Sequence, residues 1–205
     1  MQNTFIHPLA LVETSEIGDG TRVWAYTHVL KDAKIGRNCN VGENCFIEGG
    51  AIIGDNVTIK NGNMLWEGIT IESGVFIGPR VSFTNDAYPR SPRLHQARGR
   101  YQDKSWLSPT IVREGASLGA GSIILPGIEI GEFAMIGAGA VVTKNVPAYA
   151  LLKGCPALIS GWVCQCGQPL DFDYSHAICA VCGLSFDKAG QRVQQCRKRK
   201  AQLCR

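Results

Sequence analysis

The sequence predicts an all-β protein in which short strands and tight turns wind into a regular coil, and three observations predict it. Large apolar residues occupy every sixth position from Leu11 to Phe83, thirteen times without a break. The same spacing resumes at Val112 and continues to Val142. Glycine is abundant, with 24 residues, and it often follows the apolar position directly. Neither a helix of 3.6 residues per turn nor a simple alternating strand produces a six-residue period.

Each six-residue repeat is expected to form one short strand and one turn, and three repeats complete one coil of triangular cross-section. The periodic apolar residue points inward and stacks on its copies in the coils above and below. A second inward position lies four residues later and carries mostly small residues, including Cys39 and Cys45. We therefore interpret these two cysteines as core residues rather than reactive thiols. Asn63 is an exception at this position, and an internal hydrogen bond is one explanation for it.

The repeat is interrupted after Phe83, and the interruption predicts a loop over residues 84–109. This stretch begins FTNDAYPRSPR and is polar, charged and rich in proline. Insertions in repeat proteins project from the scaffold and often carry the binding surface. We thus predict a coil domain over residues 1–160 with this inserted loop, a Cys-rich segment over 161–190 and a basic tail over 191–205.

Charge and composition exclude several classes of partner. The formal net charge is +4, but residues 192–205 carry six of the 21 basic residues, and the rest of the chain is slightly acidic. An acidic body without a basic, aromatic groove argues against nucleic-acid binding. No apolar stretch is long enough to span a bilayer, and the N-terminus lacks the features of a signal peptide. These features predict a cytoplasmic protein without a membrane partner.

Residues in successive coils line up at intervals of three repeats, which predicts an edge at the start of the loop. Thr84 is expected above Trp66 and Glu48, while Asn85 and His28 share the same edge. We also place the outward aromatic side chains of Trp24 and Tyr26 there. Exposed aromatic rings at such an edge are candidates for stacking against a nucleotide base or sugar, and a contact between subunits explains them equally well.

The repeats resemble those of the hexapeptide-repeat acyltransferases, which fold as left-handed parallel β-helices and assemble as trimers with active sites between neighbouring coils. The words RVWAYTH, VFIGPRVSFTND and YPRSPR, and the ending NVPAYALLKGCPALISGW, are similar to one branch of that family. That branch acetylates the 3-amino group of nucleotide-linked sugars with acetyl-coenzyme A, for surface polysaccharide synthesis. The UDP-2-acetamido-3-amino-2,3-dideoxyglucuronate enzymes match best in layout, and the dTDP-3-amino-3,6-dideoxyhexose enzymes are close relatives. The resemblance does not decide between UDP and dTDP or identify the hexose.

The resemblance implies a catalytic role for Asn85, which matches an Asn that positions the sugar amine in the FTN motif. In that branch the sulfur of coenzyme A is the final proton acceptor, so no side-chain base is required. An Asn oxygen can accept a hydrogen bond from an amine, although Asn also begins turns. Asp86 assists or caps the loop, and His28 matches a His that contacts the sugar or nucleotide.

Other residues are candidates for binding the substrate and coenzyme A. Arg80, Arg90 and Arg93 suit a diphosphate or a uronic carboxylate, and Arg90 matches its motif best, although charged loops are commonly only solvated. Small residues on the later coils allow close approach of a pantetheine arm or simply form tight turns. The candidates for coenzyme A are Ala120, Gly121, Gly137, Ala138, Gly139, Lys144 and Lys153. Leu158 stands where the family often has a basic residue, which leaves the adenine end undefined.

The Cys-rich segment predicts a structural zinc site. The pairs in CQCG and CAVCG supply four thiolates, namely Cys164, Cys166, Cys179 and Cys182. Four thiolates in two close pairs suit tetrahedral zinc, and they leave no open position for catalysis. Four free thiols in a loosely ordered tail are the alternative. The sequence suggests no partner for Cys155, Cys196 or Cys204.

Three other functions remain compatible with a coil of this kind. The first is an acyltransferase with another acceptor, such as a 4-amino sugar or serine. Absence of a histidine beside the later repeats argues against the versions that use a His base. The others are a non-catalytic binding module and a metal-dependent anhydrase, and the latter needs several ligating histidines, whereas the chain has only four and the coil region before the loop only His7 and His28.

Overall fold

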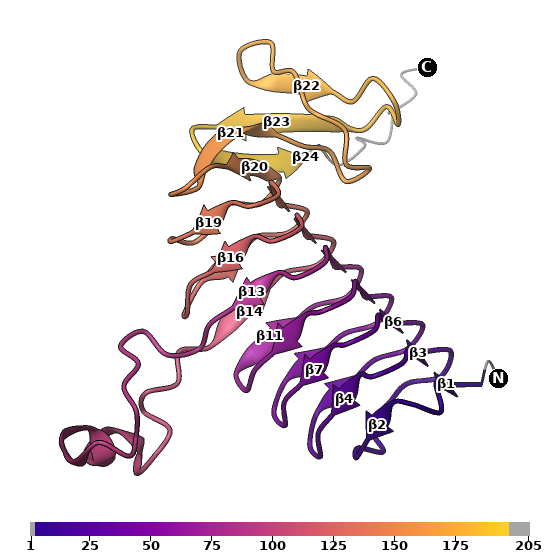
Figure 1. The fold of residues 1–205 in the computed structure, drawn as a ribbon. Coiled ribbons are helices and arrows are strands. Elements are labelled where there is room, and N and C mark those ends of the chain that lie inside the picture. The colour runs from indigo at the N-terminus through magenta and orange to yellow at the C-terminus, as the bar shows by residue number, and fades with distance from the viewer. Residues whose placement is uncertain (1–2, 197–205) are drawn as a thin grey trace, which may run out of the picture.

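The computed structural model describes residues 3–196, and it consists of a three-sided coil of parallel strands capped by a small antiparallel sheet (Figure 1). The N-terminus begins at one end of the coil, the Cys-rich segment covers the other end, and a long loop projects sideways from the middle. Most coil strands are only two residues long, and most place their first residue outward and their second residue in the core. The three sides correspond to three sheets, which we call the nine-strand, seven-strand and five-strand faces.

The nine-strand face is the longest, because it includes the strands that close the coil. Its neighbours are parallel except for the last pair, which is antiparallel. Its order is β1 (Phe5–Ile6), β3 (Arg22–Val23), β6 (Asn40–Val41), β9 (Thr58–Ile59), β12 (Phe76–Ile77), β15 (Ser117–Leu118), β18 (Met135–Ile136), β20 (Ala150–Lys153) and β21 (Leu158–Trp162).

The other two faces are parallel throughout. The seven-strand face has the order β19 (Val141–Val142), β16 (Ile123–Ile124), β13 (Ser82–Phe83), β10 (Met64–Leu65), β7 (Phe46–Ile47), β4 (His28–Val29) and β2 (Leu11–Val12). The five-strand face has the order β17 (Glu129–Ile130), β14 (Thr110–Val112), β11 (Ile69–Ile71), β8 (Ile52–Ile53) and β5 (Lys34–Ile35).

The periodic apolar residues form the core, as predicted, with one exception at the open N-terminal end. Those from Val23 to Phe83 and from Val112 to Val142 are buried. Leu11, in contrast, is 56% exposed and pairs with His28, while Val12 takes the inward place opposite Val29. The prediction for Leu11 was wrong because the first coil is one residue short, so the inward register shifts by one position.

The second inward position explains both cysteines and Asn63. The Cys39 and Cys45 thiols are buried, and burial raises the pKa of both, which suits core residues. Asn63 is fully buried but satisfied: its amide nitrogen donates to the Gly78 carbonyl at 3.0 Å, and its oxygen accepts from the Val81 N–H at 2.9 Å. The polar exception is thus an internal bridge between adjacent coils.

The C-terminal segment forms its own sheet beyond the coil. The order is β22 (His176–Ile178), β23 (Ser185–Ala189) and β24 (Arg192–Gln195), all antiparallel. The boundary predicted at residue 190 therefore falls inside this sheet, because β24 is its third strand. Most of the basic tail, together with Cys204, lies outside the described residues. Within residues 3–196 the structure has no helix suited to crossing a membrane.

Candidate active site

Two corners of the coil carry most of the predicted site residues. Corner 1 is the turn from the nine-strand face to the seven-strand face, for example residues 79–80 between β12 and β13. Corner 2 is the turn from the seven-strand face to the five-strand face. The inserted loop, residues 84–109, leaves the coil at corner 2 between β13 and β14, and its 3₁₀ helix η1 (His95–Tyr101) lies far from the coil axis (Figure 1).

Asn85 stands at the neck of the loop, where the outgoing and returning chains meet. Its carbonyl accepts a hydrogen bond from the Ser108 N–H at 2.9 Å, and the next residue, Asp86, forms a bridge with Leu107. The Asn85 side-chain nitrogen donates to the Glu67 carbonyl in the preceding coil at 3.2 Å. A carbonyl can only accept, so this contact fixes which end of the amide is nitrogen. No donor among residues 3–196 bonds to the Asn85 Oδ1.

Three residues of the two preceding coils support that position. Trp66 donates its indole N–H to the Phe83 carbonyl at 2.9 Å, which fixes the end of β13. Glu48 accepts the Glu67 N–H at 2.8 Å, and the Glu67 side chain pairs with Lys104 of the loop. Glu67 was not among the predicted site residues, although the coil spacing places it next to Asn85 in the preceding coil. Nothing in the sequence indicated that Lys104 lies here, because the loop does not follow the repeat.

Asp86 belongs to the framework of the loop. Its carboxylate pairs with the Arg100 guanidinium and accepts the Tyr101 hydroxyl at 2.8 Å and the Tyr88 N–H at 2.9 Å. Hydrogen bonding to Arg100 lowers the pKa of Asp86 below its ordinary value. Of the two roles predicted for Asp86, these contacts favour the one that shapes the loop.

His28 and Trp66 belong to one ladder of aromatic rings on the seven-strand face. Phe46 lies between them, with its ring centre 5.7 Å from each of the other two. His28 Nε2 also bonds Glu13 Oε1 at 2.8 Å, and this contact lowers the pKa of Glu13. Phe46 and Glu13 were missed as candidates. The coil spacing could have identified Phe46, because it pairs directly with His28 in the next coil.

Trp24 does not lie on the edge predicted for it. It follows β3 at corner 1, where its ring packs 5.5 Å from Phe5 and its indole N–H donates to Asn40 Oδ1 at 2.9 Å. Tyr26 lies in the same turn, with a φ of 58°. The prediction was wrong because the two residues precede the seven-strand face, whereas Trp66 and Asn85 follow it.

The three candidate arginines are not brought together. Arg80 lies at corner 1 and lines a hollow of about 300 Å³ with Met64, Trp66 and Phe83. Arg90 and Arg93 are exposed on the loop. The backbone N–H of Arg90 is held by the Tyr101 hydroxyl at 2.9 Å. We call the contacts of Asp86 with Arg100, Tyr101 and Tyr88 the clasp. Because Tyr101 also holds Arg90, the clasp positions the start of the arginine-bearing segment.

The small residues predicted for coenzyme A gather at corner 1 of the last coils. Gly121 and Gly139 adopt positive φ values of 65° and 67°, and nothing lies within 4 Å of where a Cβ would stand. These glycines therefore serve a left-handed turn and also leave open space beside it. Ala120 and Ala138 precede them and are exposed, while Lys153 packs its side chain over Gly137.

Lys144 lies elsewhere, because it follows β19 at corner 2, in the ladder position of Asn85 two coils further along. Asn85 and the Ala-Gly turns consequently stand at different corners of the same chain, on either side of the seven-strand face. One chain therefore does not bring Asn85, the residue predicted to position the sugar amine, and the small-residue turns to the same corner.

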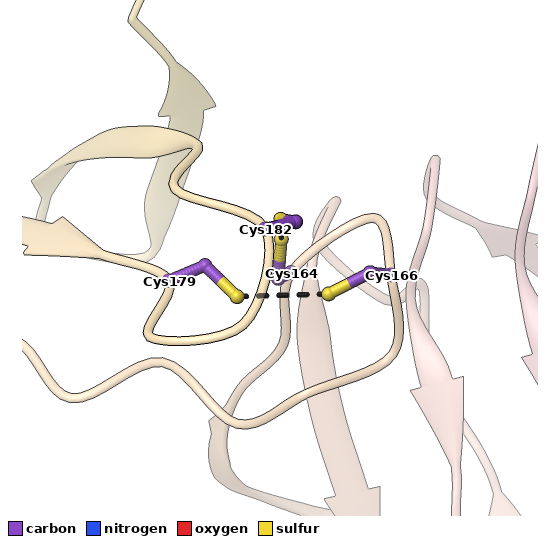
Figure 2. Close-up of side chains that lie close together, drawn as sticks. All are labelled: Cys164, Cys166, Cys179 and Cys182. Atoms are coloured by element: carbon purple, nitrogen blue, oxygen red, sulfur yellow. Dashed lines mark hydrogen bonds between the residues drawn. The ribbon is translucent and has the colours of Figure 1, made fainter.

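The four predicted zinc ligands do come together, between the end of β21 and the turn before β23 (Figure 2). All four sulfurs lie within 4.8 Å of one another; Cys164 and Cys182 are 3.3 Å apart, and Cys166 and Cys179 are 3.6 Å apart. A tetrahedral zinc with bonds of about 2.3 Å requires sulfurs about 3.8 Å apart. The cluster therefore fits this ion.

The backbone around the cluster favours a thiolate at Cys179, whereas burial disfavours one at Cys164. Gly167 and Gly183 take positive φ values after each pair, and their N–H groups donate to the Cys164 and Cys179 carbonyls at 2.8 and 2.9 Å. The backbone N–H groups of Cys182 and Val181 lower the pKa of Cys179 to about 6, whereas burial raises that of Cys164 to about 12. A bound cation would compensate the buried thiol.

Comparison with known families agrees with the coil. The family described as "Bacterial transferase hexapeptide (six repeats)" matches residues 14–49 and 109–144, on the two sides of the loop. Galactoside O-acetyltransferase of Lactococcus lactis is 36% identical over 85 residues, which is 42% of this chain and 39% of that protein. The fold, with its six-residue repeat, is thus the left-handed parallel β-helix of the hexapeptide acyltransferases.

A second relative is similar along nearly the whole chain. The dTDP-3-amino-3,6-dideoxy-alpha-D-galactopyranose 3-N-acetyltransferase of Aneurinibacillus thermoaerophilus is 48% identical over 194 residues, covering 95% of this chain and 96% of that protein. The chain belongs to the hexapeptide-repeat nucleotide-amino-sugar N-acetyltransferases, and its reaction class is acetyl transfer.

Among solved structures, the acetyltransferase domain of PglB from Neisseria gonorrhoeae, in complex with acetyl coenzyme A, shares the fold. The TM-score is 0.50 at 20% identity, over 76% of this chain and 57% of that one. At this identity the likeness concerns the coil architecture alone.

Proposed function

We propose that this protein transfers the acetyl group of acetyl-coenzyme A to the 3-amino group of a dTDP-linked 3-amino-3,6-dideoxyhexose. One observation carries the proposal: 48% identity over 95% of the chain to an enzyme named for that reaction on the galacto sugar. The same observation favours dTDP over UDP and a 6-deoxy sugar over a uronic acid. It also weighs against a 4-amino sugar or serine as the acceptor, and against a non-catalytic coil.

Asn85 is the proposed positioning residue for the amine. Its nitrogen is held by the Glu67 carbonyl, so its oxygen is available to accept a hydrogen bond from the neutral amine. The amine nitrogen attacks the thioester carbonyl, the C–N bond forms, and the C–S bond breaks. The departing sulfur of coenzyme A takes the proton that the amine loses. Asn85 contributes by orientation, which is worth large factors in rate when the reacting atoms are held in line.

We infer that the site is completed by a second copy of the chain, in a trimer. Asn85 is at corner 2 and the open Ala-Gly turns are at corner 1. A trimer in which corner 2 of one chain packs against corner 1 of the next would therefore bring them together in one site. The exposed loop arginines and His28, with its Phe46 and Trp66 neighbours, are proposed to hold the nucleotide diphosphate sugar. Lys144 and Lys153 are proposed for the phosphates of coenzyme A.

The Cys-rich segment is proposed to bind one structural zinc. Cys164, Cys166, Cys179 and Cys182 would hold it, and four protein ligands leave no position for substrate. The ion would stabilise the small sheet that covers the end of the coil. Elemental analysis of the purified protein, with Cys166→Ser for comparison, tests this role; absence of a cysteine-dependent metal would contradict it.

The activity is tested by following release of the coenzyme A thiol with acetyl-coenzyme A and four acceptors. These are a dTDP-linked 3-amino-3,6-dideoxygalactose, a UDP-linked 3-amino glucuronate, a dTDP-linked 4-amino sugar and L-serine. We expect the first to give the highest kcat/KM, and mass spectrometry to locate the acetyl group on nitrogen. Release with the 4-amino sugar or serine alone would change the acceptor, and no release with any would refute the proposal.

A further inference from the structure

A second cluster of potential metal ligands lies in the small C-terminal sheet, separate from the four cysteines. In the part of the chain that the structure describes, His176, Asp187 and Cys196 place a ring nitrogen, a carboxylate oxygen and a sulfur within 4.8 Å of one another. The sequence suggested no partner for Cys196, but in the structure its sulfur lies close to His176 and Asp187. We propose that these three residues form an open, three-ligand site for a divalent transition-metal ion of the zinc type.

Sheet pairing fixes the three side chains from three different segments. His176 of β22 stands directly opposite Asp187 of β23, and His176 Nδ1 lies 3.0 Å from Asp187 Oδ1. Cys196 follows β24, and its N–H donates to the Ser185 carbonyl at 2.8 Å. That bond brings the thiol beside the same strand, where its sulfur lies within 4.8 Å of a carboxylate oxygen of Asp187.

The donor set suits zinc better than calcium or magnesium. Imidazole nitrogen, thiolate and carboxylate are the three ligand types that zinc takes, with bonds of about 2.0 to 2.3 Å, whereas the hard cations prefer oxygen alone. A deprotonated Cys196 and Asp187 would carry two negative charges, which a divalent ion neutralises. A cross-strand His–Asp pair by itself is an ordinary sheet contact. Sheet pairing does not explain why a thiol also lies beside the same carboxylate, and a metal site does.

Exposure distinguishes this site from the four-cysteine cluster. The His176 and Asp187 side chains are 50% and 58% exposed, whereas two of the four cysteines, Cys164 and Cys179, are buried and the other two are exposed. A hollow of about 790 Å³ is lined by His176 and Cys196, and another of about 270 Å³ is lined by Asp187. Arg192 lines both hollows. With three protein ligands, the fourth position faces solvent and is open to water or a small anion, as in exchangeable zinc sites.

Zinc titration of the full-length protein tests the proposal. Metal is removed with a chelator under reducing conditions, and Zn²⁺ is titrated back in competition with a chromophoric chelator. We expect two ions per chain, one tight at the four cysteines and one weaker. Cys196→Ser and the nearly isosteric Asp187→Asn should each weaken the second site by at least about 10- to 100-fold, the range seen even for groups that only support a ligand.

Two further variants separate the sites. Cys155→Ser removes an exposed cysteine outside both clusters and should retain two ions. Cys166→Ser should lose the tight ion, and circular dichroism reports whether its sheet still forms. One ion per wild-type chain, or an unchanged affinity for the second ion in Cys196→Ser and Asp187→Asn, would overturn the second site. Neither result depends on acetyl transfer, so the proposed function is judged separately.

Discussion

Corners 1 and 2 arise from the same six-residue repeat but have diverged in opposite ways. At corner 1 of the later coils the chain keeps the shortest turns, with Gly121 and Gly139 in left-handed conformations and open space outside them. At corner 2 the chain leaves the repeat for a loop whose neck holds Asn85. A repeat scaffold can therefore offer a smooth surface at one corner and specific polar groups at another, without changing its core.

The largest expected effect comes from removing the amide at corner 2. Asn85→Ala should lower kcat by about 100-fold or more, since orientation of the amine is lost while the backbone neck remains. Steady-state kinetics measure it, and size-exclusion chromatography checks that the assembly is unchanged. Unaltered kcat in a correctly assembled variant would exclude Asn85 from the mechanism.

A substitution at corner 1 of the last coils should instead affect the binding of acetyl-coenzyme A. Ala138→Trp places a large side chain over the exposed turn, and we expect KM for acetyl-coenzyme A to rise by about 10-fold or more, with a much smaller change for the amino sugar. Glu43→Trp is the matched control, because Glu43 occupies the same corner position four coils earlier and is also exposed. Equal effects of the two substitutions would show that the turns of the last coils have no specific role in coenzyme A binding.

Mixing the two variants tests whether the corners meet between subunits. If each site takes corner 2 from one chain and corner 1 from its neighbour, random trimers of Asn85→Ala and Ala138→Trp contain intact sites in about a quarter of the interfaces. Co-refolded mixtures assayed at low acetyl-coenzyme A should regain activity that neither parent has. Activity no higher than the parental average would place both corners in one subunit's site.

The smallest expected effect concerns the clasp inside the loop. Asp86→Asn weakens the pairing with Arg100 and should raise KM for the amino sugar a few-fold near neutral pH, with KM for acetyl-coenzyme A unchanged. In the wild type the folded pKa of Asp86 lies below its ordinary 3.8, so its contribution is present above that value and lost as pH falls through the folded pKa. The clasp itself should thus add no pH dependence between about pH 6 and 9. An unchanged sugar KM in Asp86→Asn would show that the clasp does not order the binding surface.

Much of the fold could be predicted because a repeat makes each local choice recur. A single inward apolar position from Val23 to Phe83 identifies strands, turns and core together, and Asn63 is a buried polar residue that its hydrogen bonds to the next coil explain. The first coil escaped prediction, since the loss of one residue before Ile17 moves Val12 inward and Leu11 outward without breaking the apolar pattern. The clustering of the four cysteines could be predicted equally well, because their spacing in the sequence suits a single metal ion.

What the sequence by itself determined is the coil, the site of its interruption and the close spacing of the four cysteines, all of which are local or periodic properties. Only the tertiary structure decided which corner each residue occupies, because one position along the repeat maps to three faces. It separated Trp24 from Trp66, joined Asp86 to Arg100 across the loop, and held the Asn85 side-chain nitrogen on the Glu67 carbonyl. It also brought Cys196 to His176 and Asp187, since antiparallel pairing joins residues that no sequence spacing connects.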